Sequence, residues 1–364
     1  VYLAGPRSYT GEDTVEFSCH GGMRPVQQTL EVLLKQGARA AEPGEFTLRA
    51  FLNGRIDLAQ AEAVMDVVTA RTARALHAAV GGLHGDLSAR VRVCRSQLLD
   101  VLAYLTASSD FPEEGIAAER VTPPLAAALD VLASLLATAQ EGVLVRDGVR
   151  TAIVGLPNAG KSSLLNRLLG WDRAIVADQA GTTRDTLSET MSINGIPFLL
   201  TDTAGIARAT IDPVERMGVA RSRQAAAAAS LLLVVIDGSL PVGDDLRTLA
   251  QTVPATPAVL AVNKSDLPPG TADVEALAGL FPASTACVRV SAITGDGIDR
   301  LRAALAKAVS GDKAGAEDQL LVGNPRHVAL LTQALAGVES ALAAQHACIP
   351  ADLVAIDVNA AVNA

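Results

Sequence analysis

The segment Val149-Arg-Thr-Ala-Ile-Val-Gly-Leu-Pro-Asn-Ala-Gly-Lys-Ser162 decides the fold of the central part of this chain. Residues 149–154 are mostly apolar and are typical of a buried strand. From Gly155 onward the residues match G-x-x-x-x-G-K-[ST], which indicates a phosphate-binding loop when it joins a strand to a helix. Glycines let backbone N–H groups approach phosphates, and the N-terminus of the following helix favours negative charge.

The chain on either side of this loop predicts an α/β sheet flanked by helical stretches. Helical patterns separate further apolar strands, which are expected near 187–193, 197–202, 231–237, 257–263 and 286–291. Strands that alternate with helices are typical of a doubly wound sheet. Residues from about 57 to 140 and from 325 to 344 have helical spacing instead. In the first of these stretches, we expect Asp110 to cap a new helix and Pro123-Pro124 to interrupt one.

These patterns divide the chain into four segments. We expect a partial N-terminal α+β domain at 1–55, the first part of a helical domain at 56–146, an inserted α/β domain at 147–311, and the second part of the helical domain at 312–364. Within the first segment, the alternating residues 14–18 predict a short strand.

The composition restricts the functions open to this chain. Of 364 residues, 49% are hydrophobic and 3% aromatic, and the formal net charge is −9. So few aromatic rings argue against nucleic-acid binding by stacking, and the acidic charge gives no general attraction to phosphate backbones. No stretch reaches the roughly 18 uncharged apolar residues of a membrane span. The four widely spaced cysteines form no metal-binding pair, so a reducing cytoplasm is expected.

Several residues are expected to hold phosphates and a magnesium ion. Lys161 can reach the β- and γ-phosphates, and Ser162 can ligate Mg²⁺. Asp202 ends a predicted strand in the sequence Asp-Thr-Ala-Gly, where it would hold Mg²⁺ through water while Gly205 senses the γ-phosphate. Thr183 would add a Mg²⁺ ligand that depends on the γ-phosphate, which predicts a switch. An ordinary polar loop is the alternative for Thr183 and its neighbours.

Two further motifs predict that the base is guanine. The Asp266 carboxylate in Asn263-Lys264-Ser265-Asp266 can accept two hydrogen bonds, from guanine N1–H and from its 2-amino group. A backbone N–H of Ser291-Ala292 can contact guanine O6. Each short motif alone is common in turns. Four motifs in order, each at the carboxyl end of a strand, indicate a GTP site because ligands of open α/β sheets bind there.

The residues expected to orient water and to supply positive charge differ from those of many small GTPases. Ile206 follows Gly205, where many small GTPases have a glutamine that orients water. Ile cannot do this, so Glu215 is our candidate, with an ordinary exposed helix-start glutamate as the alternative. Asn158 lies inside the phosphate loop, and its carbonyl oxygen can ligate a monovalent cation that supplies the charge of an arginine finger.

Longer motifs resemble one family. They are Gly5-Pro-Arg-Ser-Tyr-Thr-Gly-Glu-Asp13, His20-Gly-Gly22, Pro43-Gly-Glu-Phe-Thr47, Arg49-Ala-Phe-Leu-Asn-Gly-Arg-Ile-Asp-Leu-Ala-Gln-Ala-Glu62, Asp110-Phe-Pro-Glu-Glu114, Leu156-Pro-Asn-Ala-Gly-Lys-Ser-Ser163 and Ala180-Gly-Thr-Thr-Arg-Asp185. Together they make the chain similar to the tRNA-modification GTPases of the MnmE (TrmE) family over essentially its whole length. The resemblance implies a Ras-like P-loop G domain inserted into a helical domain, after a partial folate-binding domain.

The resemblance also implies potassium-stimulated hydrolysis when two G domains pair. The K⁺ ligands would be Asn158, Ala177, Gln179 and Thr182, and the catalytic set would be Glu215, Lys161 and Arg184. The GTP contacts would come from Asn158, Ala159, Gly160, Lys161, Ser162, Ser163, Ala177, Asp178, Gln179, Ala180, Gly181, Thr182, Thr183, Asp202, Thr203, Ala204, Gly205, Asn263, Lys264, Asp266, Ser291 and Ala292.

For the reaction on tRNA, the resemblance implies a homodimer that forms a heterotetramer with the FAD-dependent partner MnmG. The complex would add a carboxymethylaminomethyl group at C5 of the wobble uridine, U34. The one-carbon unit would come from a tetrahydrofolate derivative, 5-formyl- or 5,10-methylene-tetrahydrofolate. Glu16 falls where the family contacts folate, with a solvent-facing strand residue as the alternative. Arg55 stands where many members have lysine, which keeps the charge but changes its geometry.

The chain departs from the family at both ends. The family's folate domain begins upstream of Val1, and its members end in a Cys-x-Gly-Lys tail. Cys348 lies in a different context, so we expect a buried or incidental thiol there. A chain without those ends is expected to hydrolyse GTP, and whether it supports modification stays open.

Two alternatives remain. Ribosome-associated GTPase switches carry similar G domains but add an RNA-binding module or a second G domain, whereas here an Ala- and Leu-rich helix follows residue 309. The second concerns basic residues that either face tRNA or form a solvated helix face, namely Arg71, Arg74, Arg90, Arg92 and Arg95.

Overall fold

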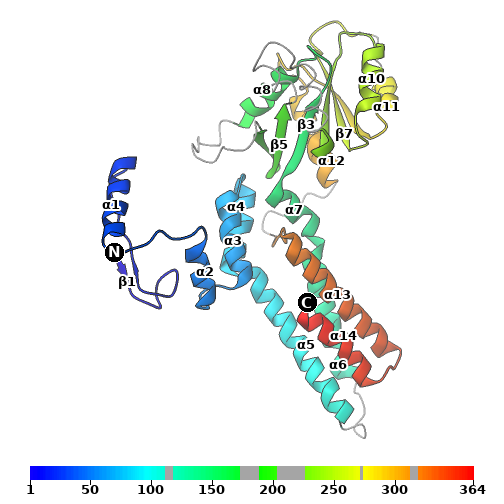
Figure 1. Ribbon diagram of the computed structural model, residues 1–364. Helices are drawn as coiled ribbons and strands as arrows, with labels where there is room; N and C mark the ends of the chain where they lie inside the picture. Colours follow the sequence, from blue (N-terminus) through cyan, green and yellow to red (C-terminus); the bar gives the residue numbers. More distant parts are fainter. Residues whose placement is uncertain (111–117, 173–187, 203–225, 271–273, 312–318) are drawn as a thin grey trace. The chain divides into compact units, whose positions relative to one another are not determined.

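The computed structural model describes residues 1–110, 118–172, 188–202, 226–270, 274–311 and 319–364. The chain forms two compact units (Figure 1). The first consists of Val1–Ala70, Leu76–Ser134 and Leu330–Ala364, and the second of Arg71–Ala75 and Leu135–Ala329. The second unit therefore lies in sequence between segments of the first. The predicted domain boundaries near 147 and 311 differ from this division and stay predictions.

The second unit contains a six-stranded sheet in the order β4-β5-β3-β6-β7-β8. Its strands are β3 (Val149–Val154), β4 (Ser188–Ile193), β5 (Ile196–Asp202), β6 (Leu231–Asp237), β7 (Ala258–Asn263) and β8 (Ser284–Arg289). All neighbouring strands are parallel except β4 and β5. The predicted strands are confirmed, although β8 begins and ends two residues earlier than expected.

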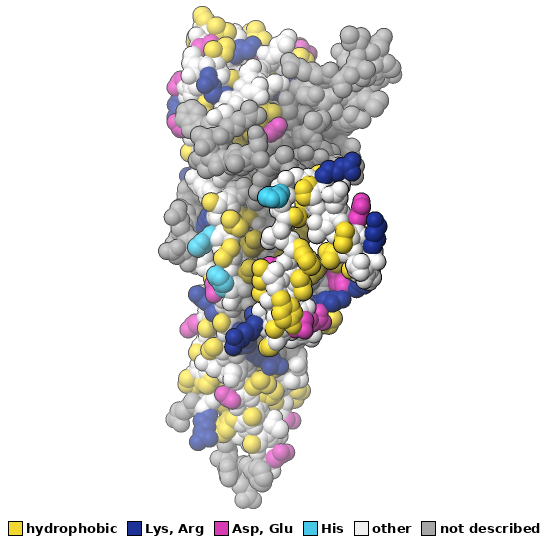
Figure 2. Space-filling model, turned by 90° about the vertical axis from the view of Figure 1, so that its left-hand side faces the viewer, with side chains coloured by type: hydrophobic (Ala, Val, Ile, Leu, Met, Phe, Trp, Pro, Cys, Tyr) yellow, Lys and Arg dark blue, Asp and Glu magenta, His cyan; other side chains and the backbone are white. Residues whose placement is uncertain are grey.

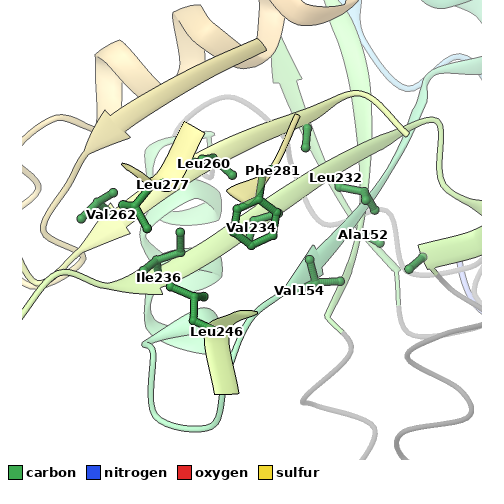
Figure 3. Close-up of a cluster of buried hydrophobic side chains, with 12 residues drawn as sticks. Ala152, Val154, Leu232, Val234, Ile236, Leu246, Leu260, Val262, Leu277 and Phe281 are labelled. Carbon is green, nitrogen blue, oxygen red and sulfur yellow. The ribbon is translucent and has the colours of Figure 1, made fainter. Parts of the chain in front are cut away.

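Helices cover both faces of this sheet (Figure 1). They are α8 (Lys161–Asp172), α10 (Asp244–Thr252), α11 (Val274–Leu280) and α12 (Ile298–Ser310), while α7 (Ala139–Asp147) leads into β3. On one face, Leu246 and Leu277 of α10 and α11 pack with strand residues such as Val234 (Figure 3). Side chains alternate along a strand, so the neighbouring residue Leu233 faces the opposite side. The buried apolar runs that predicted the strands thus form a sheet with helices on both sides.

The entry and exit of this unit are joined. The backbone N–H of Val322 donates to Thr138 Oγ1 at 3.2 Å, and that hydroxyl donates to the Leu135 carbonyl at 2.8 Å. A Cβ at Gly142 would lie 2.6 Å from the Val322 carbonyl, so only glycine allows this approach. The chain therefore enters the unit directly beside the place where it leaves.

Residues 71–75 hold the β4–β5 turn of the same unit. Thr72 Oγ1 donates to the Gly195 carbonyl at 2.8 Å, and Arg74 pairs with Glu141 of α7 at 2.6 Å. The Arg74 side chain is 16% exposed. Arg74 is therefore engaged within this unit, whereas Arg71, Arg90, Arg92 and Arg95 are exposed, and contact of these arginines with tRNA stays a prediction.

The first unit contains a bundle of long helices. They are α3 (Leu58–Thr69), α4 (Ala73–His84), α5 (Asp86–Asp110), α6 (Ala118–Ala137), α13 (Pro325–His346) and α14 (Ala351–Asn363). α5 and α14 pack together, and α5 buries residues at the spacing of one helix face, Cys94, Leu98, Val101 and Leu105. A Cβ at Gly337 of α13 would lie 3.0 Å from Ala361 of α14, so these helices approach closely.

One local expectation in this unit is wrong. Pro123 and Pro124 lie inside α6, where the buried face formed by Val121 and Leu125 holds the helix together through the prolines. Asp110 is the last described residue of α5, and the helix that it was expected to cap would begin outside the described residues. Cys348 is exposed in the turn between α13 and α14, which contradicts a buried thiol and leaves an incidental one.

Two helical stretches, Arg120–Asp147 and Pro325–His346, are long and apolar enough to cross a membrane by length and composition. Neither stretch contains roughly 18 consecutive residues without a charged side chain. Core helices of soluble proteins pass the same test, and both stretches have a buried face. The absence of a membrane span stays a prediction.

Residues 1–55 form β1 (Tyr2–Leu3), β2 (Thr14–Val15), α1 (Met23–Lys35) and α2 (Glu45–Leu52). The strand predicted at 14–18 is shorter than expected. None of the residues of α1 is buried. Apolar side chains gather on this segment, which faces the viewer in Figure 2, and the exposed ones include Val15, Phe17, Met23, Val26 and Leu30. An exposed apolar patch of this kind is typical of an interaction surface.

Candidate functional site

The phosphate loop joins β3 to α8 in a strained backbone conformation. Asn158 has a φ of 60°, and Gly160 has a φ of 90°. A Cβ at Gly160 would lie 2.2 Å from Asn263 Nδ2. The loop therefore passes so close to the end of β7 that only glycine fits at this position.

Lys161 begins α8 directly after the loop. Its ammonium group donates to the carbonyls of Gly155 at 2.9 Å and Leu156 at 2.8 Å, and the residue is 9% exposed. The charge is thus held over the loop that is expected to receive the phosphates. Ser162 and Ser163 follow in the first turn of the helix, and the positive end of a helix dipole favours anions there.

Asn263, the last residue of β7, connects two of the predicted motifs. Its Nδ2 donates to the Ala159 carbonyl of the phosphate loop at 2.9 Å. Its Oδ1 accepts from the Ala292 backbone N–H at 3.0 Å. The side chain is 2% exposed, so both hydrogen bonds lie in the interior and fix the phosphate loop relative to Ser291-Ala292.

Lys264 adopts a φ of 64°, and its ammonium group pairs with Asp237 Oδ2 at 2.6 Å. Asp237 Oδ1 accepts from the backbone N–H and the hydroxyl of Ser239, at 3.0 and 2.6 Å. Burial raises the pKa of Asp237, but the hydrogen bonds from Lys264 and Ser239 outweigh it, so that its pKa is lowered. Asp237 therefore holds Lys264 in place as a charged partner.

Ser291 Oγ donates to Asp266 Oδ1 at 2.6 Å, which ties the last two motifs together. The Ala292 N–H, expected to contact guanine O6, is engaged by Asn263. In the described loop 291–296, Ile293 is the residue whose backbone N–H has no acceptor. In this described loop the Ile293 N–H is therefore the backbone donor available to a ligand, and the contact of Ser291-Ala292 with guanine O6 stays a prediction.

Two residues of this site were missed by sequence reasoning. Asp237 ends β6, and its place at the carboxyl end of a parallel strand was a signal that could have identified it. Arg167 of α8 donates from Nε to the Ala292 carbonyl at 3.0 Å and from Nη2 to the Ile293 carbonyl. Nothing in the local sequence points to this contact.

Many of the predicted site residues lie outside the described residues. They are Ala177, Asp178, Gln179, Ala180, Gly181, Thr182, Thr183, Arg184, Thr203, Ala204, Gly205 and Glu215. For Asp202 the backbone is described, at the carboxyl end of β5 beside Ile153 of β3. In the described part of the chain, no group of three His, Cys, Asp or Glu side chains is placed to hold a metal ion. The expected Mg²⁺ ligands therefore stay a prediction.

The two expected folate contacts lie in the N-terminal segment, and both are exposed. The backbone of Glu16 pairs with Val1 through two hydrogen bonds of 2.8 and 2.6 Å. Arg55 follows α2, and its N–H donates to the Ala50 carbonyl at 2.8 Å. No contact between these two side chains is seen among the described residues.

A hollow of about 300 Å³ lies nearby, between the loop before β2 and helix α2. Its wall contains the ion pairs of Glu45 with Arg39, at 2.5 Å, and with Arg49, at 2.8 Å. Arg49 also pairs with Glu12 at 2.9 Å. The hydrogen bond from Arg39 is the largest influence on Glu45 and lowers its pKa to about 2. Four charged side chains of this wall are therefore paired within the segment, whereas Asp13 accepts a hydrogen bond from the Gly5 N–H at 2.9 Å.

Two family profiles together match almost the whole chain. The profile described as the MnmE helical domain matches residues 58–364, and that described as the GTP-binding protein TrmE N-terminus matches residues 1–55.

Individual relatives named "tRNA modification GTPase MnmE" match the whole chain. That of Roseiflexus castenholzii is 49% identical, covering 100% of this chain and 80% of the relative. That of Enterococcus faecalis is 44% identical, covering 98% of this chain and 77% of the relative. Among solved structures, the G domain of the T. maritima FeoB iron transporter covers 43% of this chain and 96% of that domain, at 22% identity. The TM-score of this match is 0.31, so the two folds are only distantly alike.

Proposed function

Because this chain belongs to the MnmE (TrmE) family of tRNA modification GTPases, we propose that it binds and hydrolyses GTP in the modification of tRNA. The observation that carries this function is the Asn263 side chain, which joins the phosphate loop to Ser291-Ala292. This arrangement supports a site in which the triphosphate lies on the N-terminus of α8 and the base lies against the ends of β7 and β8.

Guanine is proposed to be recognised by the Asp266 carboxylate and by the loop after β8. The test is Asp266→Asn, because an amide can donate to the O2 of xanthine whereas a carboxylate accepts from the 2-amino group of guanine. We expect this variant to lose affinity for GDP and to gain affinity for xanthosine diphosphate. An unchanged preference for GDP would contradict the assignment.

Hydrolysis uses Lys161 and Arg184 at the phosphates and Glu215 to orient water. Mg²⁺, held by Ser162, Thr183 and Asp202, would neutralise developing charge on the phosphates. Glu215→Ala is expected to slow turnover while GTP still binds. Wild-type turnover in this variant would remove Glu215 from the mechanism.

Potassium stimulation is assigned to Asn158 and residues 177–182, with two G domains paired. Asn158 is exposed, so its side chain is accessible to a cation, which supports a ligand role. Asn158→Ala is expected to lower the stimulation by K⁺ more than it lowers nucleotide affinity. Equal loss of activity in K⁺ and Na⁺ would contradict the cation role.

The reaction on tRNA is proposed to take place in the cytoplasm, in a homodimer bound to an FAD-dependent MnmG-type partner. A tetrahydrofolate derivative would bind near Glu16 and Arg55 and supply the carbon added to U34. The exposed apolar residues of 1–55 support dimerisation through this segment. Analysis of wobble uridine in tRNA from cells that lack the protein tests this step. Unmodified U34 is expected, and normal U34 would contradict it.

The alternative of a ribosome-associated switch has no observation in its favour. Such proteins add an RNA-binding module after the G domain, whereas here α13 and α14 follow and belong to the helical unit.

A further inference from the structure

We infer that Arg167 is a positioning residue for guanine recognition, because it fixes the peptide group that presents the Ile293 N–H to the base. The inference rests on the proposed function, in which the loop after β8 lies against guanine. It concerns a residue outside every motif of the site.

In the described loop 291–296, hydrogen bonds within the protein engage every backbone N–H group except one. The N–H of Ala292 donates to Asn263 Oδ1 at 3.0 Å, and the N–H of Thr294 donates to Ser291 Oγ at 3.1 Å. The N–H groups of Ser291, Gly295 and Asp296 are also paired within the loop. In this described loop, the Ile293 N–H is thus the donor left for a ligand.

Arg167 determines where this donor points. Its Nε donates to the Ala292 carbonyl at 3.0 Å, and its Nη2 donates to the Ile293 carbonyl. The Ala292 carbonyl and the Ile293 N–H belong to one planar trans peptide group, in which they point in opposite directions. Holding the carbonyl against α8 therefore directs the N–H away from α8.

The planar guanidinium group suits this task. It presents its N–H groups in a fixed fork, which can hold two consecutive carbonyls at once. Arg167 also lies in the helix that begins with Lys161. It therefore links the loop beside the base directly to the helix that receives the phosphates.

The test compares three diphosphates, which bind without being hydrolysed. GDP has O6, the N1 hydrogen and the 2-amino group, IDP lacks the 2-amino group, and 2-aminopurine riboside diphosphate lacks O6 and the N1 hydrogen. Each is titrated in competition with a fluorescent GDP analogue against the full chain. For Arg167→Ala, we expect affinity for GDP and IDP to fall about fivefold, the size of one neutral hydrogen bond, and affinity for the 2-aminopurine nucleotide to stay the same.

Two further variants separate positioning from general loss of structure. Arg167→Lys keeps the charge and the donors but loses the fixed planar fork, so it should restore part of the preference for O6. Arg302→Ala removes a comparable hydrogen bond, from Nη2 to the Ser192 carbonyl at 2.8 Å, between α12 and β4. This matched control should leave the ratio of GDP to 2-aminopurine affinity unchanged.

The outcomes distinguish the inference from the function on which it rests. If Arg167→Ala weakens all three nucleotides equally, or leaves all three unchanged, Arg167 does not position the O6 donor. If the wild-type chain does not prefer GDP over the 2-aminopurine nucleotide, the proposed guanine site itself is wrong.

Discussion

Asn263 and Ala159 are 104 positions apart in sequence, yet the side-chain amide of Asn263 donates to the Ala159 carbonyl at 2.9 Å. The other end of the same amide accepts from Ala292. One buried side chain therefore satisfies polar backbone groups of two separate loops, and both loops depend on it.

Replacing Asn263 with Ala should destabilise the second unit and weaken nucleotide binding together. The Ala159 carbonyl and the Ala292 N–H would lose their partner in the interior, which costs about 2–4 kcal/mol. Urea unfolding measures this loss. The control is Asn166→Ala, an exposed residue of α8, for which a change of less than about 0.5 kcal/mol is expected. Equal stability of the two variants would show that the bridge contributes nothing.

Gly160→Ala should abolish nucleotide binding, because the added Cβ would lie 2.2 Å from Asn263 Nδ2 at a positive φ. Isothermal titration with GDP measures the effect. Gly170→Ala is the matched control, since a Cβ there meets no atom of the described residues within 4 Å. In the helix this change is expected to stabilise the protein by up to about 1 kcal/mol and to leave GDP affinity intact. Normal GDP binding by Gly160→Ala would refute the close approach.

Asp237→Asn should weaken the protein in a pH-dependent way. The pKa of Asp237 is lower in the folded protein than its ordinary value, so its stabilising effect is present above about pH 4 and is lost as the pH falls through the folded pKa. At pH 7 we expect a loss of about 1–2 kcal/mol, since the Lys264 ammonium loses its partner. Chemical unfolding at pH 7 and pH 3 measures the difference.

The difference between wild type and Asp237→Asn should shrink at pH 3. Asp245→Asn, an exposed change in α10, serves as the control and should have little effect at either pH. A gap of the same size at both pH values would mean that the charge of Asp237 is not what stabilises the site.

Glu45 should titrate at an unusually low pH. Its pKa of about 2 reflects first the hydrogen bond from Arg39. The folded pKa lies below the ordinary value of 4.5, so the stabilising effect of these ion pairs is present above pH 4.5 and fades as the pH falls towards 2. Carboxyl chemical shifts in an NMR titration give the midpoint directly.

Arg39→Gln should move that midpoint upward, towards 4.5. Arg24→Gln, which changes an arginine of α1 outside the cluster, should leave it in place. A wild-type midpoint near 4.5 would argue against the ion pairs seen in the wall of the hollow.

The strands and the phosphate loop could be predicted because their signals are local. Buried parallel strands need continuous apolar runs, and 231–237 and 257–263 have them. Pro123 and Pro124 misled the prediction, since the buried face of α6 outweighs the local preference of proline. Asp237 and Arg167 act through residues 27 and 125 positions away. Such pairs become visible only when the sheet brings their segments together.

The hydrogen bond between Val322 and Thr138 brings together the two ends of the long segment that forms most of the central unit. A stretch of chain whose two ends already touch can be removed from a gene, and the gap closed with a few residues, without moving what lies on either side. It can equally be grafted into another host at any exposed turn of matching width. The nucleotide-binding part of this protein can therefore be exchanged as one inserted segment, since its two ends lie side by side.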